Sequence, residues 1–136
     1  MSNIEQTLSI IKPDAVERNL IEKIKDIFIQ KKLTIKESKK IQITKDEAAE
    51  FYKVHQSKPF FNDLCSYLSS GPIVVMILEG ENAVIENRKL MGATDPKNAD
   101  DNTIRKMYGI SIDKNSVHGS DSIKNAKKEI EFFFKN

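Results

Sequence analysis

The stretch from Ile73 to Leu78 constrains the fold more than any other, because it is an unbroken apolar run directly after Gly71-Pro72. A short apolar run bounded by turn residues is typical of a buried strand. The run therefore predicts a central strand of a sheet, around which the other elements must pack.

The first part of the chain alternates between strand and helix patterns. Thr7 to Ile11 is β-branched and predicts a strand, and Pro13 then predicts the first position of a helix. Apolar residues at helical spacing between 14 and 30 predict a helix that breaks near Asn19. Residues 33–43 predict a second strand with a solvated lysine face.

The second part of the chain adds helices and a last short strand. Thr44 and Glu47 form a capping box that opens a helix. Further helices are expected after Pro59, from Glu81 to Gly92, from Thr103 to Tyr108 and from Ile123 to Phe134, with a short strand around Ser116-Val117. This βαββαβ-like order predicts an α+β fold, with an antiparallel sheet and helices on one side.

Composition limits the kind of protein that this can be. A chain of 136 residues fits one domain, residues 1–136, and the net charge of +2 excludes a global basic field for nucleic acid or an anionic membrane. The single Cys65 cannot form an intramolecular disulfide, and no apolar run is long enough to cross a bilayer. These features predict a cytoplasmic protein that is not bound to a membrane.

The stretch from Asn115 to Ser122 gathers a possible nucleophile, His118, with hydroxyls, a carboxylate and Gly119. Glycine lets a ligand or backbone approach closely. The alternative is an ordinary loop in which Ser120, Asp121 or Ser122 caps the next helix. The pattern of this stretch alone does not decide between the two.

Other segments supply groups that could work with His118. Lys12, Arg88 and Arg105 lie in separate segments and could converge on phosphates, although each taken singly is more often a surface charge. Glu129 follows on the last helix, where its carboxylate could orient the imidazole and leave the other nitrogen free, or could instead pair with a nearby lysine. No spacing of His or Cys resembles a zinc site.

At this point the residues resemble a known family. Asn115 to Asp121 (NSVHGSD) is similar to the active-site signature NxxHGSD of the nucleoside diphosphate kinases. Six further segments resemble that family in the same order: TLSIIKPDAV (7–16), HQSKPFFNDL (55–64), GPIVVM (71–76), EGENA (79–83), RKLMGAT (88–94) and TIR (103–105). The resemblance covers essentially the whole chain.

The resemblance implies a ferredoxin-like βαββαβ fold, with a four-stranded antiparallel sheet and helices packed around it. It implies a ping-pong reaction in which His118 takes the γ-phosphoryl group of a nucleoside triphosphate, chiefly ATP, and passes it to a nucleoside diphosphate, which maintains the (d)NTP pools. Mg²⁺ on the phosphates is the implied cofactor. The implied partners are these nucleotides and further copies of the chain, as a hexamer or tetramer.

The resemblance also assigns roles to individual residues. Glu129 would orient His118, Ser120 would support it, and Lys12 would be the fourth catalytic residue. Asp121 would bind the metal through water. The implied nucleotide-binding residues are Lys12, Tyr52, Phe60, Leu64, Arg88, Thr94, Arg105, Ile112 and Asn115. In this set Phe60 and Ile112 would sandwich the base, and stacking of this kind tolerates every base.

The chain departs from the family pattern in several places. Val54 stands where an acidic residue is common, Lys58 replaces a frequent Arg, and Asp101-Asn102 replaces the usual Pro-Gly. The sequence also stops soon after Phe134, as in bacterial-type members with a short C-terminus. The alternative to a kinase is a ferredoxin-like nucleotide- or nucleic-acid-binding module without turnover, but such modules usually carry stacking aromatics on their strands, and 7–11 and 73–78 contain none.

Overall fold

The computed structural model describes residues 4–112 and 114–134. They form a four-stranded sheet in the order β2-β3-β1-β4. The strands are β1 (Ile4–Ile11), β2 (Thr34–Ile41), β3 (Ile73–Glu81) and β4 (Val117–Gly119). All three neighbouring pairs are antiparallel, which confirms the predicted ferredoxin-like α+β sheet with β3 inside it.

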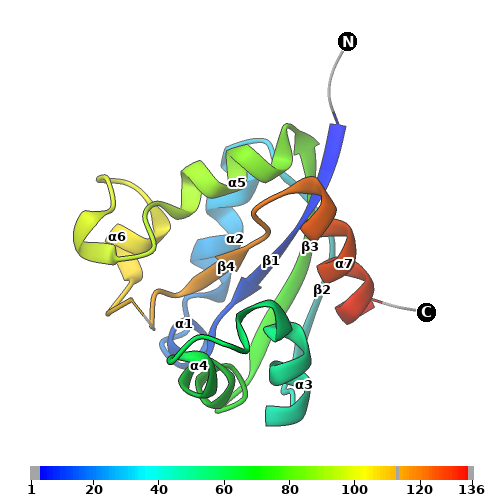
Figure 1. Ribbon diagram of the computed structural model, residues 1–136. Coiled ribbons are helices and arrows are strands. Elements are labelled where there is room, and N and C mark those ends of the chain that lie inside the picture. The colour runs from blue at the N-terminus through cyan, green and yellow to red at the C-terminus, as the bar shows by residue number, and fades with distance from the viewer. Residues whose placement is uncertain (1–3, 113, 135–136) are drawn as a thin grey trace.

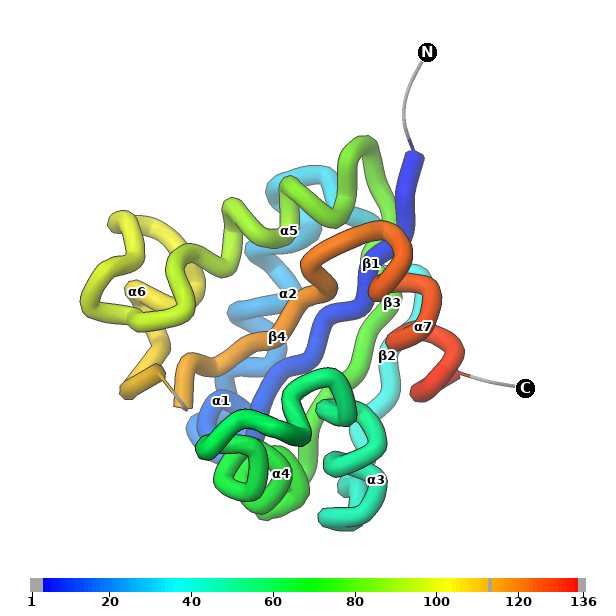
Figure 2. Tube along the Cα trace, viewed as in Figure 1, coloured from blue at the N-terminus to red at the C-terminus, as the bar shows by residue number. Residues whose placement is uncertain are grey.

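Helices of very different length connect the strands (Figure 1). They are α1 (Pro13–Glu17), α2 (Ile21–Gln30), α3 (Lys45–Phe51), α4 (Phe61–Leu68), α5 (Ala83–Met91), α6 (Ile104–Tyr108) and α7 (Ile123–Phe134), with the 3-10 turns η1 (Lys53–His55) and η2 (Pro96–Asn98). The segment with η2 and α6 projects to the left of the sheet in Figures 1 and 2, whereas α3 and α4 lie together at its lower end. The η2–α6 segment and the α3–α4 pair thus lie at different places around the sheet.

The helices cover both faces of the sheet, so the prediction of helices on one side is wrong. One core joins Met76 and Leu78 of β3 to α1, α2 and α5. The other joins Ile73 and Val75 of the same strand to α3, α4 and α7. Alternate residues of a strand point to opposite faces, so the unbroken apolar run of β3 feeds both cores. The run itself therefore indicated two covered faces.

Local signals set most element boundaries. Pro13 occupies the start of α1, the Thr44 capping box opens α3, and Asn19 breaks the first helical pattern with a φ of 61°. Glu81 does not begin a helix as predicted but ends β3, and α5 starts after Asn82, which has a φ of 53°. Asparagine tolerates this left-handed conformation better than other non-glycine residues, so it can turn the chain sharply from strand to helix.

The structure explains how Asp101-Asn102 can stand where the family usually has Pro-Gly. Asn102 adopts a φ of 70°, a conformation that glycine adopts without cost and asparagine adopts more readily than other residues. Asparagine can therefore take the turn in which the family usually has glycine. Among the residues that the structure describes, no helix has the length and apolar character that crossing a bilayer requires.

Candidate active site

His118 lies on β4, the edge strand of the sheet, directly opposite Ile10 of β1. Residues that face each other across antiparallel strands point to the same side of the sheet. Ile10 belongs to the core formed with α3, α4 and α7. The pairing with β1 therefore directs the His118 side chain toward these helices, where it is partly buried.

A chain of hydrogen bonds fixes the imidazole. Nε2 of His118 lies 3.1 Å from Oε1 of Glu129, and the Ser120 hydroxyl donates to the same oxygen at 2.8 Å. The backbone N–H of Leu8 donates to Ser120 Oγ at 3.3 Å. A carboxylate only accepts, so it places the imidazole proton on Nε2 and leaves the lone pair on Nδ1. Nδ1 is thus the ring nitrogen that is left free to act as a nucleophile.

Helix α7 positions Glu129 from the side. The helix begins where the Ser122 hydroxyl accepts from the Asn125 N–H at 3.1 Å, which confirms the expected cap. Ala126 and Phe133 are buried on the sheet side, and Glu129 lies between them in sequence. A residue three positions after Ala126 lies at the edge of the buried face. The carboxylate can therefore reach the sheet edge while remaining partly exposed.

Gly119 allows α5 to pack against the strand beside His118. A Cβ on Gly119 would lie 2.3 Å from Nδ2 of Asn87 and 2.8 Å from Cε of Met91. Both side chains come from α5, and Asn87 is fully buried. Any larger residue at 119 would push β4 away from this helix.

A cavity of about 510 Å³ opens in front of the imidazole. Its lining includes His118, Gly119, Asp121 and Glu129, together with Glu50, Phe51, Lys53, Val54, His55, Asn125, Lys128 and Phe132. Ligand pockets commonly have about this volume. The predicted nucleophile thus faces a space that can receive a small molecule.

Polar contacts join three of the predicted nucleotide-binding residues. Lys12 Nζ donates to Asn115 Oδ1 at 3.0 Å, and Asn115 Nδ2 donates to the carbonyl of Thr94 at 3.1 Å. Lys12 follows β1, Asn115 precedes β4 and Thr94 follows α5. The antiparallel pairing of β1 and β4 therefore brings together residues that are far apart in sequence.

Arg105 is a buried cation next to the end of β4. Its guanidinium donates to the carbonyls of Gly92 and Val117, each at 3.0 Å. Burial, and then the nearby cation Arg88, lowers the pKa of Arg105 to about 10. Among the described residues, neither Arg105 nor Arg88 forms an ion pair with a carboxylate, and Arg105 Nε is buried without a partner. An anionic ligand would compensate this buried charge.

Tyr52 and His55 come from the segment that runs from α3 to η1. Tyr52 is buried, and its burial raises the pKa of the phenol above its ordinary value. His55 Nδ1 is buried without a hydrogen-bond partner among the described residues. Burial, then Lys58 and His118, lowers the pKa of His55, so this imidazole is neutral at pH 7.

Three residues that contact this site had no role in the sequence-based prediction. The ring of Phe51 lies edge-on to His118 with 5.3 Å between ring centroids. His55 lines the cavity, and Asn87 packs against Gly119. Asn87 could have been noticed, because it is a polar residue on the apolar face that Val84 and Met91 define. Phe51 follows the helical spacing of an ordinary core residue and gave no such signal.

The predicted base-binding residues differ in exposure. Phe60 and Ile112 are 44% and 55% exposed, as a stacking platform open to a ligand would be. Leu64 instead packs against the core under α3 and α4. Phe60 is near the site through His55, whose ring centroid is 6.4 Å away, but the contacts described do not bring Phe60 and Ile112 together.

Asp121 is an exposed carboxylate at the rim of the cavity. It accepts from Asn125 Nδ2 at 2.6 Å, and this hydrogen bond is the main reason why its pKa is lowered. Val54, which replaces a common acidic residue, is also in the lining and is 79% exposed. Among the described residues, no group of three or more His, Cys, Asp or Glu side chains could hold a metal ion.

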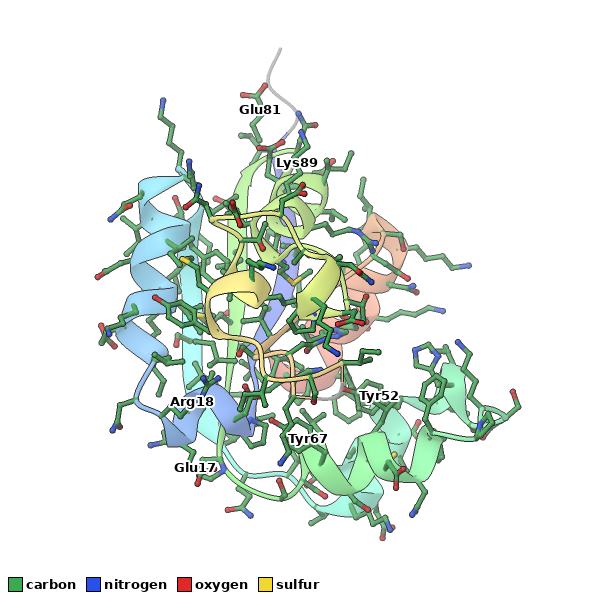
Figure 3. All side chains as sticks on the ribbon, turned by 90° about the vertical axis from the view of Figure 1, so that its left-hand side faces the viewer. Glu17, Arg18, Tyr52, Tyr67, Glu81 and Lys89 are labelled. Carbon is green, nitrogen blue, oxygen red and sulfur yellow. The ribbon has the colours of Figure 1, made fainter. Side chains whose placement is uncertain are left out.

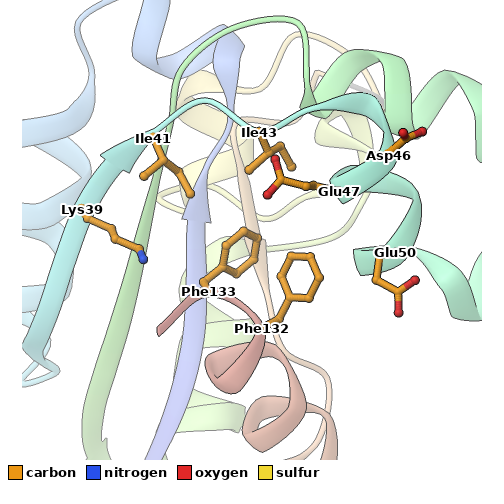
Figure 4. A pocket seen from close by; sticks show the side chains of 8 residues that line it. All are labelled: Lys39, Ile41, Ile43, Asp46, Glu47, Glu50, Phe132 and Phe133. Atoms are coloured by element: carbon orange, nitrogen blue, oxygen red, sulfur yellow. The ribbon is translucent and has the colours of Figure 1, made fainter. Parts of the chain in front are cut away.

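A second cavity, of about 420 Å³, lies on the other side of Phe132 (Figure 4). Ile41, Ile43 and Phe133 form the apolar part of its lining. Lys39 and the carboxylates of Asp46, Glu47 and Glu50 form the charged part. Neither His55 nor His118 lines this cavity, whereas both line the first one.

Known proteins match this chain over nearly its whole length. The family model "Nucleoside diphosphate kinase" matches residues 5–136. A nucleoside diphosphate kinase of a Nitratiruptor species is 62% identical over 131 residues, which cover 96% of each chain. That of Campylobacter jejuni is 58% identical over 132 residues, covering 97% of this chain and 96% of its own.

Solved structures match equally well. The Aquifex aeolicus nucleoside diphosphate kinase superposes with a TM-score of 0.97 at 43% identity, covering 98% of this chain and 97% of its own. The enzyme from Encephalitozoon cuniculi gives a TM-score of 0.94 at 39% identity, covering 97% and 90%. Sequence and fold agree, and the chain therefore belongs to the nucleoside diphosphate kinase family and has the activity of that family.

Proposed function

We propose that His118 carries the phosphoryl group between two nucleotides, chiefly from ATP to other nucleoside diphosphates, within one domain of residues 1–136. The observation that carries this proposal is the hydrogen-bonded chain from Ser120 through Glu129 to His118 Nε2. It holds the imidazole in the tautomer that leaves the Nδ1 lone pair free, and His118 lines a cavity large enough for a ligand.

The first half-reaction forms one bond and breaks one. The Nδ1 lone pair attacks the γ-phosphorus, and the bond from that phosphorus to the bridging oxygen breaks. The electron pair leaves on the terminal oxygen of the nucleoside diphosphate. The phosphoimidazole cation keeps its Nε2 proton, which the Glu129 carboxylate stabilises. In the second half-reaction an oxygen of another nucleoside diphosphate attacks the same phosphorus, and Nδ1 regains its lone pair.

The cations around β4 bind the phosphates in this proposal. Arg88 lies close enough to Arg105 to lower the pKa of Arg105. Because neither arginine pairs with a carboxylate among the described residues, together they favour a polyanion. Lys12 is held in place by Asn115. Phosphate oxygens would also accept from the Tyr52 and Thr94 hydroxyls, because burial keeps the Tyr52 phenol protonated. Asn115 with Lys12 would reach the ribose.

The exposed side chains of Phe60 and Ile112 would hold the base, with Leu64 packing beneath them. Contacts of this kind use the faces of the ring rather than its hydrogen-bonding edge, and all bases have such faces. We therefore expect broad nucleotide specificity.

A nucleotide-binding kinase of this family typically needs a divalent cation, and we propose Mg²⁺. The exposed carboxylate Asp121 fits a contact through water, because Mg²⁺ is usually bound by substrate phosphates and one or two carboxylates. When bound, the ion offsets the charge of the transferred phosphates. Val54 itself supplies no carboxylate to the cavity, so the nucleotide phosphates would supply most of the ligands.

We also propose a cytoplasmic homo-oligomer, either a hexamer or a tetramer. The lone buried cysteine suits a reducing compartment. Strand β2 is an open sheet edge, and exposed apolar residues such as Ile29 and Ile85 suit contacts with other copies. Sedimentation velocity over a range of concentrations measures the assembly, and a monomer at micromolar concentration would contradict this part of the proposal.

The chemistry is tested with ATP labelled in the γ position. We expect the wild type to acquire a phosphate that is labile to acid and stable to base, and that leaves on addition of a nucleoside diphosphate. His118→Ala should acquire none. The mechanism is wrong if the wild type takes no label or the variant keeps it. A binding module without turnover would give the first of these results, and the family match does not favour it.

A further inference from the structure

A buried polar cluster lies where α1, α4 and the turn before β4 meet. At its centre is Asp14, whose side chain is 3% exposed. The Tyr67 hydroxyl donates a short hydrogen bond to Asp14 Oδ1 and accepts from the Asp14 N–H at 2.8 Å. Arg18 Nη2 pairs with Asp14 Oδ2 at 3.0 Å, and Ser116 Oγ donates to the same oxygen at 2.9 Å. The carboxylate is thus fully paired.

Arg18 extends this cluster to a fourth segment. Its Nη2 donates to the carbonyl of Tyr108, the last residue of α6, at 2.5 Å, and to Ser116 Oγ at 3.3 Å. Its Nε donates to the carbonyl of Asp14 at 3.0 Å. Figure 3 shows Arg18 and Tyr67 reaching this region from the α1 side and from α4.

Each segment that the cluster joins carries a residue proposed to bind the nucleotide. Lys12 directly precedes α1, Leu64 lies on α4 and Arg105 lies on α6. Asn115 is the neighbour of Ser116. The cluster itself contains none of the residues that we expect to touch the nucleotide. It can therefore affect the reaction only by holding these segments in place.

Ser116 has a backbone conformation that needs such support. Its φ is +77°, and the N–H of Val117 donates to the carbonyl of Asn115 at 3.0 Å, which makes a three-residue turn of a rare and strained type. Residues held in this way are strained and persist only where the surrounding contacts hold them firmly. Here the Lys12 N–H binds the Ser116 carbonyl at 2.8 Å, and the cluster binds its hydroxyl.

The turn at Ser116 sets the direction of the residues on both sides of it. Asn115 contacts Lys12 on one side, and His118 follows two residues later on the other. We propose that Asp14 and Arg18 are positioning residues for phosphoryl transfer: through the Ser116 hydroxyl they hold the left-handed turn that fixes Asn115 and His118 relative to each other. This inference rests on the proposed phosphorylation of His118.

The test combines two substitutions, because each acts on the same turn by a different route. Arg18→Gln removes the cation that supports Asp14 and Ser116. Ser116→Gly removes the hydroxyl but supplies a residue that adopts a positive φ without cost. The rate of phosphohistidine formation at saturating ATP is measured by rapid quench for the wild type, both single variants and the double variant.

We expect Arg18→Gln to slow this rate about 10- to 100-fold in the wild-type background, since small displacements of reacting groups have effects of this size. The ATP concentration at half-maximal rate should change much less. In the Ser116→Gly background the same substitution should cost less than about threefold, because the turn no longer depends on the cluster. Lys36→Gln, which removes a cation from the ion pair with Glu79 between β2 and β3, is the matched control and should leave the rate unchanged.

Equal losses from Arg18→Gln in both backgrounds would overturn the inference, because Arg18 would then act independently of the turn. A wild-type rate in Arg18→Gln would also overturn it. If Arg18→Gln does not fold, Tyr67→Phe removes the donor to Asp14 from the α4 side, and the same comparison with Ser116→Gly applies. Absence of label in the wild type would instead refute the proposed function, so the two failures are distinct.

Discussion

The contact between Gly119 and α5 gives a prediction whose size follows from the structure. In Gly119→Ala the new Cβ would lie 2.3 Å from Asn87 Nδ2 and within 2.9 Å of both Cε and Sδ of Met91. Met91 is flexible, but Asn87 is fully buried and has no space to rotate away. Overpacking of this kind costs about 1–3 kcal/mol. For a chain of this length the melting temperature should fall by at least about 3 °C.

The assay compares Gly119→Ala with the double variant Asn87→Ala/Gly119→Ala. Calorimetry at one fixed protein concentration gives the melting temperatures, because assembly makes them depend on concentration. Shortening Asn87 removes the amide at 2.3 Å, and its Oδ1 has no partner among the described residues, so this change alone should cost little. The double variant should recover more than half of the loss. An equal loss in both backgrounds would show that the contact with Asn87 is not the cause.

Three further predictions concern the site. Glu129→Gln keeps the shape of the contact with His118 but removes the charge of the carboxylate. Phosphohistidine formation measured by rapid quench should slow about 10-fold, because charge-assisted hydrogen bonds are about twice as strong as neutral ones. A rate equal to that of the wild type would show that Glu129 has no part in the mechanism. The pKa of His55 is lowered from 6.5, chiefly by burial, so the unfolded chain binds this proton at a higher pH than the folded chain does, and stability falls as the pH drops below 6.5. In His55→Gln the melting temperature should therefore depend less on pH in this range. An unchanged dependence on pH would contradict the assignment. Phe60→Ala should weaken purine and pyrimidine nucleotides alike, by about 10-fold in titration calorimetry, whereas selective loss of one base would argue against simple stacking.

Local physics explains why much of the fold could be predicted. Pro13 at a helix start, the Thr44 capping box and the break at Asn19 each depend on a few neighbouring residues, and the structure shows all three. The buried strand at 73–78 followed from its apolar run alone. The order of the elements did not show that helices cover both faces, although the apolar residues on both faces of β3 were an indication of it.

The site divides in the same way. The family segments named His118 and the cations, and the position of Glu129 on the last helix made it the candidate to orient His118. The sequence could not show that Asn87 limits residue 119, because that contact exists only once α5 lies on β4. Nor could it connect Arg18 to the site, since the contacts of Arg18 with Ser116 and Tyr108 cross about two thirds of the chain. What the sequence determined by itself was therefore the kinds of residue and their local conformations. Only the tertiary structure decided which of them come into contact, because such contacts form when β4 pairs antiparallel with β1 at the edge of the sheet.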